Sequence, residues 1–154
     1  MTNNDIMRRI RYTFNFDDSK MIAIFAAADF EATRAQISDL LKKEDAPDYK
    51  ECNDKVLAIF LNGFINERRG KKEGEQSEPE EKLTNNIIFT KIKIALNLKS
   101  DEILDILNMV EVDISKHELS AFFRKSTHKN FRACQDQVLR KFLKGMQLKY
   151  RTDD

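Results

Sequence analysis

Apolar residues recur every three or four positions along most of the chain, the spacing that places them on one face of an α-helix. The clearest run is 52–63, Cys-Asn-Asp-Lys-Val-Leu-Ala-Ile-Phe-Leu-Asn-Gly. A close copy stands 82 residues later at 134–145, Cys-Gln-Asp-Gln-Val-Leu-Arg-Lys-Phe-Leu-Lys-Gly. The same offset places Asn3-Asn4 on Asn85-Asn86. The pattern therefore predicts one helical unit that occurs twice.

The repeat covers almost the whole chain. About one position in four between residues 2 and 69 is identical to the position 82 residues later, and most of the others keep their polarity. We predict an all-α fold of two homologous four-helix units with a pseudo-two-fold relation. The offset gives a first repeat at 1–69, a linker at 70–82, a second repeat at 83–151 and a tail at 152–154.

The first helix of each unit is predicted at 3–15 and 85–97, where an apolar residue recurs every four positions. Thr2 and Thr84 precede these helices, and a hydroxyl there accepts a hydrogen bond from a free amide of the first turn. The pattern breaks and restarts near residues 19 and 101, which begins a second helix with a broad apolar face in each unit.

The third helices are predicted at the strongest local signals in the chain. Thr33 with Gln36, and Ser115 with Glu118, have the spacing of a capping box, in which two side chains bond reciprocally to the backbone of the first turn. The fourth helices are the repeated runs themselves.

Two residue types occupy equivalent places in the fourth helices. Gly63 and Gly145 each cost about 1 kcal/mol relative to alanine inside a helix, so their presence in both copies predicts the close crossing of a neighbouring helix. Backbone exposure for function is the less favoured alternative. Cys52 and Cys134 are interpreted as buried reduced thiols with a shared packing role rather than a disulfide.

The linker at 70–82 has no apolar residue and is rich in Glu, Gly, Ser and Pro. Such a segment cannot bury enough surface to offset the entropy of ordering. We predict that it is flexible and acidic.

The composition favours a helix-rich protein with little net charge. Apolar residues are 41% and charged residues 34%, and four Gly and two Pro leave little material for hairpins. The net charge is +1, although residues 83–154 hold 13 basic and 9 acidic side chains. Mixed charge on solvated helix faces is the favoured explanation. No secretory signal and no membrane-spanning run is present, so we expect a cytoplasmic protein.

Catalytic and metal-binding patterns are not apparent. The two cysteines and the two histidines, His117 and His128, do not have the spacing of a zinc site. Neither histidine has a histidine counterpart in the first copy, and no Gly-rich phosphate loop occurs. We therefore expect no cofactor, no metal and no enzymatic activity.

Nucleic-acid binding is one of two binding hypotheses. The second helix, a short turn and the capped third helix of each unit resemble a helix-turn-helix. Acidic residues on the same elements, Asp39 among them, oppose phosphate binding. The candidate contacts are Arg34, Gln36, Lys42 and Lys43 in the first unit, and Lys116, His117, Arg124 and Lys125 in the second.

The favoured hypothesis is a non-enzymatic interaction or regulatory module, because duplicated helical units often expose a groove between copies. Its partner would be an unidentified protein or a second copy of this chain, with no role for a membrane. Two polar doublets in the first turns are candidate partner contacts, although local capping and turn chemistry is favoured for them. These doublets are Asn3, Asn4, Asn85 and Asn86.

The Thr-Asn-Asn-x-Ile start, the capped third helix, the Cys-x-Asp-x-Val-Leu-x-x-Phe-Leu-x-Gly block and the tandem arrangement together resemble the YehS-like family. The resemblance covers essentially the whole chain. It implies a bacterial, cytoplasmic protein of unknown function, and it carries no activity, ligand or site residues. The resemblance also implies a glycine in the turn between the second and third helices, where this chain has Asp29 and Glu111.

Overall fold

The computed structural model describes residues 1–151 and is helical throughout its regular parts, with no strand in that range. The all-α class is confirmed. The tail predicted at 152–154 lies outside the described residues. The first unit contains α1 (Asn3–Phe14), α2 (Asp18–Ala27), α3 (Arg34–Leu40) and α4 (Asp54–Arg69), and the second contains α5 (Asn85–Leu96), α6 (Ser100–Asn108), α7 (Lys116–Ala121) and α8 (Asp136–Tyr150).

Side-chain caps start the first and third helices of both units as predicted. The hydroxyl of Thr2 accepts from the amide of Asp5 at 3.0 Å, and that of Thr84 accepts from Ile87 at 3.2 Å. Full capping boxes begin α3 and α7. Local sequence therefore sets where these four helices begin.

The turn between the second and third helices has a left-handed residue in each unit. Asp29 has φ 61° and Glu111 has φ 63°. This conformation places a Cβ close to the following carbonyl, which glycine avoids. The glycine implied by the family resemblance would therefore suit the backbone, and this chain adopts the same turn with acidic residues.

Both helix glycines lie where two helices touch, as predicted. A Cβ built on Gly63 would lie 2.0 Å from the carbonyl oxygen of Ile24 in α2. A Cβ built on Gly145 would lie 2.6 Å from the carbonyl oxygen of Ile106 in α6. Glycine thus permits α4 to cross α2, and α8 to cross α6, at backbone contact.

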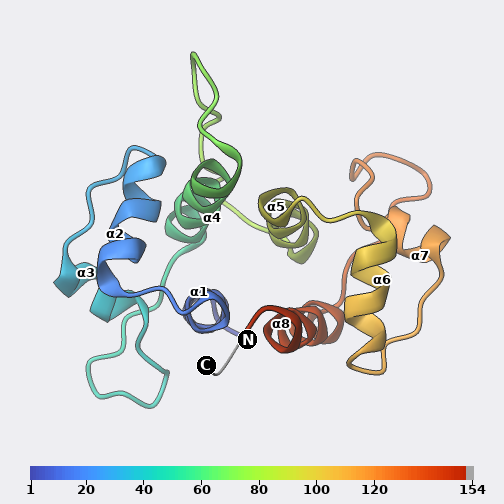
Figure 1. The fold of residues 1–154 in the computed structure, drawn as a ribbon, viewed down its shortest axis with the longest axis horizontal. Coiled ribbons are helices and arrows are strands. Elements are labelled where there is room, and N and C mark those ends of the chain that lie inside the picture. The colour runs from blue at the N-terminus through green and yellow to red at the C-terminus, as the bar shows by residue number, and fades with distance from the viewer. Residues whose placement is uncertain (152–154) are drawn as a thin grey trace.

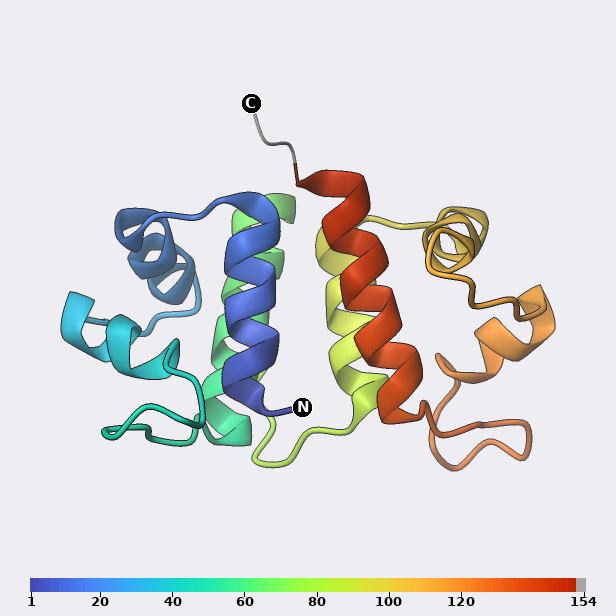
Figure 2. The ribbon, with the colours of Figure 1, turned by 90° about the horizontal axis from the view of Figure 1, so that it is seen from below.

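Four helices form the centre of the molecule: α1, α4, α5 and α8 (Figure 1). The pair α2 and α3 flanks this centre on one side, and α6 and α7 flank it on the other. Between the units, α4 packs along α5 and α1 packs along α8. Exchanging the two units converts the first contact into the second, so the units meet through the same contact made twice. Figure 2 views the α1/α8 side.

The core is continuous across both units and is rich in phenylalanine. Phe60 and its counterpart Phe142 are both fully buried, and the Phe142 ring lies 4.4 Å from that of Phe89. Phe14 joins the units, with its ring 5.5 Å from Phe64 and 5.4 Å from Tyr150. Fully burying a side chain of this size contributes about 1.5–3 kcal/mol, so these phenylalanines contribute substantially to the stability of the fold.

Candidate functional site: two equivalent grooves

The second asparagine of each doublet links distant backbone segments of its own unit through side-chain hydrogen bonds, an arrangement called here an asparagine tie. The side-chain amide of Asn4 donates to the carbonyls of Leu40 and Lys50, both at 3.0 Å, and its oxygen accepts from the amide of Cys52 at 2.8 Å. Asn86 repeats this with Phe122, Arg132 and Cys134. Asn4 is fully buried and Asn86 is 8% exposed. These two side chains are engaged inside the fold and do not face a partner.

The first asparagine of each doublet ties the start of α1 or α5 to the start of α4 or α8. Asn3 donates to the carbonyl of Cys52 at 3.0 Å and to the carboxylate of Asp54 at 2.8 Å. Asn85 makes the same bonds with Cys134 and Asp136. Both side chains are half-buried. The doublets therefore make tertiary bonds within their own unit, 36 to 51 residues along the chain, in place of the local capping and turn chemistry that the sequence favoured.

The cysteines beside these ties are buried free thiols. Burial, reinforced by the neighbouring carboxylate of Asp54, raises the pKa of Cys52 to about 12. Burial likewise raises the pKa of Cys134 to about 11, with Asp136 adding to the effect. The thiolate is the reactive form of cysteine, so neither residue has the environment of a nucleophile. No cluster of metal-ligating side chains occurs in the described part of the chain.

The first-unit candidates for nucleic-acid contact are largely engaged with acidic or backbone groups. Gln36 closes its capping box, and Lys42 pairs with Asp39 and Asp48. Arg34 is exposed, with Asp18 at 4.0 Å. Neighbouring acids thus lie close to Arg34 on α3 and offset the charge of Lys42 just after it. Lys43, the fourth candidate, lines a different groove, described below.

The second-unit candidates divide between two regions. Lys116 lies 3.4 Å from Asp101, and His117 is exposed on α7. Arg124 and Lys125 line a groove beside α5. Because α3 and α7 stand on opposite flanks (Figure 1), the structure does not bring the two candidate sets together.

A groove between α1 and α8 gathers basic residues from both units. Its cavity volume is about 570 Å³. Arg8 pairs with Asp5 and also donates to the carbonyl of Leu41 at 3.2 Å. Arg9, Lys43 and Arg140 make no ion pair with any described residue. The lining residues are Met1, Asp5, Arg8, Arg9, Tyr12, Lys43, Arg140 and Leu143.

Exposed apolar side chains accompany this positive charge. Tyr12 is 44% exposed and Met1 is 42% exposed on the α1 side. On α8, Arg140, Lys144 and Leu148 are all exposed, and their spacing of four places them on one helix face. Aromatic residues, Met and Arg are enriched at protein interfaces, so the α1/α8 groove has the composition of a binding surface.

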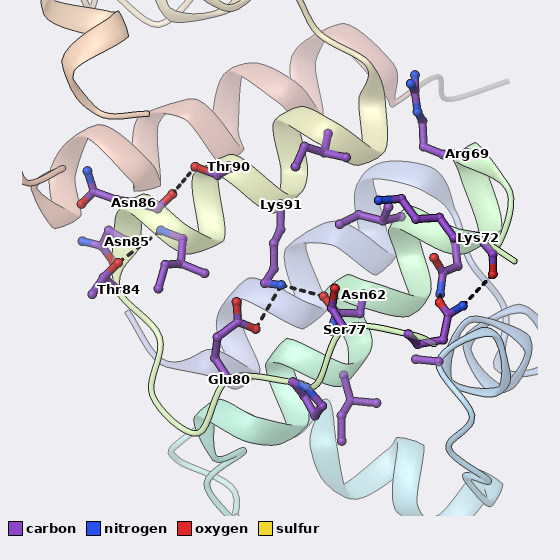
Figure 3. A pocket seen from close by; sticks show the side chains of 18 of the residues that line it. Asn62, Arg69, Lys72, Ser77, Glu80, Thr84, Asn85, Asn86, Thr90 and Lys91 are labelled. Atoms are coloured by element: carbon purple, nitrogen blue, oxygen red, sulfur yellow. Dashed lines mark hydrogen bonds and ion pairs between the residues drawn. The ribbon is translucent and has the colours of Figure 1, made fainter. Parts of the chain in front are cut away.

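A second and larger groove lies beside α4 and α5, with a cavity volume of about 1210 Å³ (Figure 3). At its centre the ammonium group of Lys91 donates to the side-chain oxygen of Asn62 at 2.6 Å and lies 3.1 Å from the carboxylate of Glu80. Arg69 and Lys72 stand at one end. The Lys91 side chain is only 13% exposed, so its ion pair with Glu80 is largely screened from solvent.

The chain's own linker forms part of the wall of this groove. Glu80 pairs with Lys91, and Glu81 lies 3.3 Å from Lys55 at the start of α4. Beyond the linker, the amide of Leu83 donates to the carboxylate of Asp54 at 2.8 Å. The end of the segment predicted as a flexible acidic linker thus contacts the body of the molecule, whereas residues 70–78, apart from Gln76, are exposed and have no helix or strand.

The family model described as "Protein of unknown function (DUF1456)" matches the chain twice, at residues 3–70 and 85–152. The chain belongs to this family. A relative in Escherichia coli (strain K12), "Uncharacterized protein YehS", is 44% identical over 147 residues, covering 95% of this chain and 94% of its own length. The resemblance seen in the sequence is thereby confirmed. No solved structure matches the chain.

Membership of the family adds no ligand or activity to the geometry. The two family matches coincide with the two structural units, which agrees with a duplicated unit. No described helix has both the length and the apolar character needed to cross a bilayer. The basic α1/α8 groove was missed by sequence reasoning. Its one local signal was the Arg8-Arg9 doublet followed by Tyr12.

Proposed function

We propose that this protein is a non-enzymatic binding module that holds an acidic partner protein in the α1/α8 groove. The observation that carries the proposal is the convergence of Arg9, Lys43 and Arg140 without ion pairs among residues 1–151. Opposite charge steers a partner to such a surface and suppresses partners of like charge. A second copy would present the same positive groove, so charge disfavours symmetric self-association through it.

The exposed apolar residues favour a protein over nucleic acid. Phosphate contacts are made by basic and polar side chains and by backbone amides, and they leave the exposed side chains of Met1 and Leu148 without a role. The ring of Tyr12 is partly covered by the Arg151 guanidinium, 4.1 Å from the ring centroid, and is 44% exposed. A protein partner buries such exposed apolar side chains at the centre or rim of an interface. The raised pKa values of both buried thiols argue against a role for either as a catalytic nucleophile, and buried reduced cysteines suit a reducing compartment such as the bacterial cytoplasm.

Nucleic-acid binding is the second candidate, because a basic groove also attracts phosphate. The helix-turn-helix-like pairs contribute less, since α3 has seven residues, α7 has six, and their charges are offset by Asp39, Asp48 and Asp101. Titration with generic duplex DNA and RNA at two salt concentrations tests this candidate. Micromolar binding that weakens steeply with salt would place nucleic acid ahead of protein.

Site-specific photo-crosslinking in cells tests the protein-binding proposal. A photoreactive phenylalanine analogue at Tyr12 reports on the α1/α8 groove, and the same analogue at Ile94, its exposed counterpart in the repeat, is the matched control. We expect one discrete protein adduct from position 12 that Arg140→Glu abolishes. Equal adducts from both positions, or none from position 12, would refute the assignment of the groove.

A further inference from the structure

The two grooves are counterparts under the repeat. Five residues of the α1/α8 groove have their equivalents, 82 positions later, in the lining of the α4/α5 groove. The residues Asp5, Arg8, Arg9, Tyr12 and Lys43 correspond to Ile87, Thr90, Lys91, Ile94 and Lys125. What occupies one groove is therefore informative about the other.

The α4/α5 groove already has a segment of known chemistry along one wall. Residues 70–80 contribute most of one wall, and they run without helix or strand from the end of α4 toward the start of α5. The linker at 70–82 carries five glutamates and three lysines. Its Glu80 pairs with Lys91, the counterpart of Arg9. An acidic, non-helical segment thus sits on the position that Arg9 occupies in the other groove.

The α1/α8 groove has the stronger charge for such a segment. Arg8 corresponds to the neutral residue Thr90 in the α4/α5 groove, and Arg140 corresponds to Ala58, which is buried and lies outside that groove's lining. Lys144, one turn after Arg140 on the exposed face of α8, corresponds to the neutral Asn62. Within residues 1–151 only α1, α8, Met1 and Lys43 line the α1/α8 groove. No residue of the linker at 70–82 lines this groove.

We infer that the α1/α8 groove binds an extended acidic segment of a partner protein in the way that the α4/α5 groove holds the linker, with a carboxylate on Arg9. This inference rests on the proposed protein-binding function and specifies the form of the partner. Glu80 on Lys91 is the template for the central ion pair, and Arg140 and Lys144 receive further carboxylates along the segment.

A peptide copied from the linker is the direct probe. The blocked peptide Gly-Glu-Gln-Ser-Glu-Pro-Glu-Glu-Lys-Leu reproduces residues 74–83 and carries four glutamates and one lysine. Its binding to the full chain is measured by fluorescence anisotropy at low and moderate salt, and its position by amide chemical-shift changes. We expect shifts centred on Arg9, Tyr12 and Arg140, with affinity that falls as salt rises.

Matched variants identify the groove. Arg9→Glu and Arg140→Glu, one on each helix, each reduce peptide affinity at least tenfold, whereas Lys129→Glu makes the same charge change on an exposed loop of the second unit and reduces it less than twofold. Circular dichroism confirms folding, and Arg140→Glu remains informative if Arg9→Glu unfolds, because Arg140 is exposed. A peptide with glutamine in place of every glutamate is expected not to bind.

Two outcomes would overturn the inference. Peptide shifts that map away from α1 and α8, or affinity unchanged by Arg140→Glu, would show that the groove does not take an acidic segment. A single-stranded oligonucleotide that binds the groove while the peptide does not would assign the groove to nucleic acid. If the position-12 crosslink captures a protein but the peptide fails, the protein-binding function stands and only the extended acidic form of its partner is rejected.

Discussion

The α1/α8 and α4/α5 grooves began as equivalent surfaces and now differ in charge and in covering. The first presents Arg9 and Arg140 to solvent, and the second has Lys91 and Ala58 at those positions, with the acidic linker laid over Lys91. Beneath both grooves the framework is unchanged, since each unit keeps its asparagine tie and its glycine crossing. Duplication has preserved the interior and diversified the surface.

Substitution of the asparagine ties should lower the free energy of unfolding more than any other change considered, and by similar amounts in the two units. Asn4→Ala leaves two carbonyls and the amide of Cys52 without their partner, and Asn86→Ala does the same in the second unit. We expect each to lower the free energy of unfolding by about 3 kcal/mol, measured by urea denaturation. A large loss for one and none for the other would contradict a shared framework.

Alanine at the glycine crossings should give the next largest loss of stability, and the loss should be greater in the first unit than in the second. Gly63→Ala places a methyl group 2.0 Å from a backbone oxygen, and Gly145→Ala places one at 2.6 Å. Overpacking outweighs the gain in helix propensity, so we expect net losses of about 2 kcal/mol for Gly63→Ala and about 1 kcal/mol for Gly145→Ala. Denaturation curves for both variants give the comparison, and a gain for either would show that the crossing helix yields.

Equivalent substitutions in the two grooves, unlike those in the framework, should change the free energy of unfolding by different amounts. Lys91→Ala removes the partner of Glu80 and of the Asn62 side chain, so we expect a loss of about 1 kcal/mol. Arg9→Ala removes a side chain that has no ion pair within the described chain, so we expect a change below about 0.5 kcal/mol. A double-mutant cycle of Lys91→Ala with Glu80→Gln measures the coupling. Zero coupling would mean that the linker does not depend on this contact.

The left-handed turns should give the smallest effect, and a favourable one. Glu111→Gly removes the steric cost of φ 63°, offset in part by the entropy of glycine in the unfolded chain. We expect a gain of about 0.5 kcal/mol in the free energy of unfolding. Asp29→Gly should gain less, because aspartate tolerates this conformation better and Lys71 pairs with Asp29 at 2.6 Å. A loss in Glu111→Gly would mean that its side chain stabilises the turn.

Most of the fold could be predicted from local signals in the sequence. The offset of 82, the capping boxes at Thr33 and Ser115, and the paired glycines each report on neighbours within a few residues or on the repeat itself. The asparagine doublets were ambiguous in the sequence, because an amide in a first turn can face either way. Only the tertiary path of residues 40–52 shows that Asn4 faces inward.

The candidate site was harder to predict because it joins residues from different copies. Arg9 and Arg140 are 131 positions apart and share a groove only because α1 packs along α8. The charges on α3 and α7 were counted from local sequence, whereas pairs such as Lys116 with Asp101 form across helices. A charge inventory along the chain cannot separate paired from unpaired cations.

The contact between units has an evolutionary corollary. The contact of α4 with α5 is equivalent to the contact of α8 with α1. A single ancestral unit would therefore have presented both contact surfaces, one on its first helix and one on its fourth, and could have assembled as a symmetric homodimer. Such a dimer is bound to keep its two grooves identical, because every substitution appears in both. Fusion into one polypeptide released that constraint, which allowed one groove to be bordered by the joining segment while the other acquired Arg9 and Arg140 on its lining.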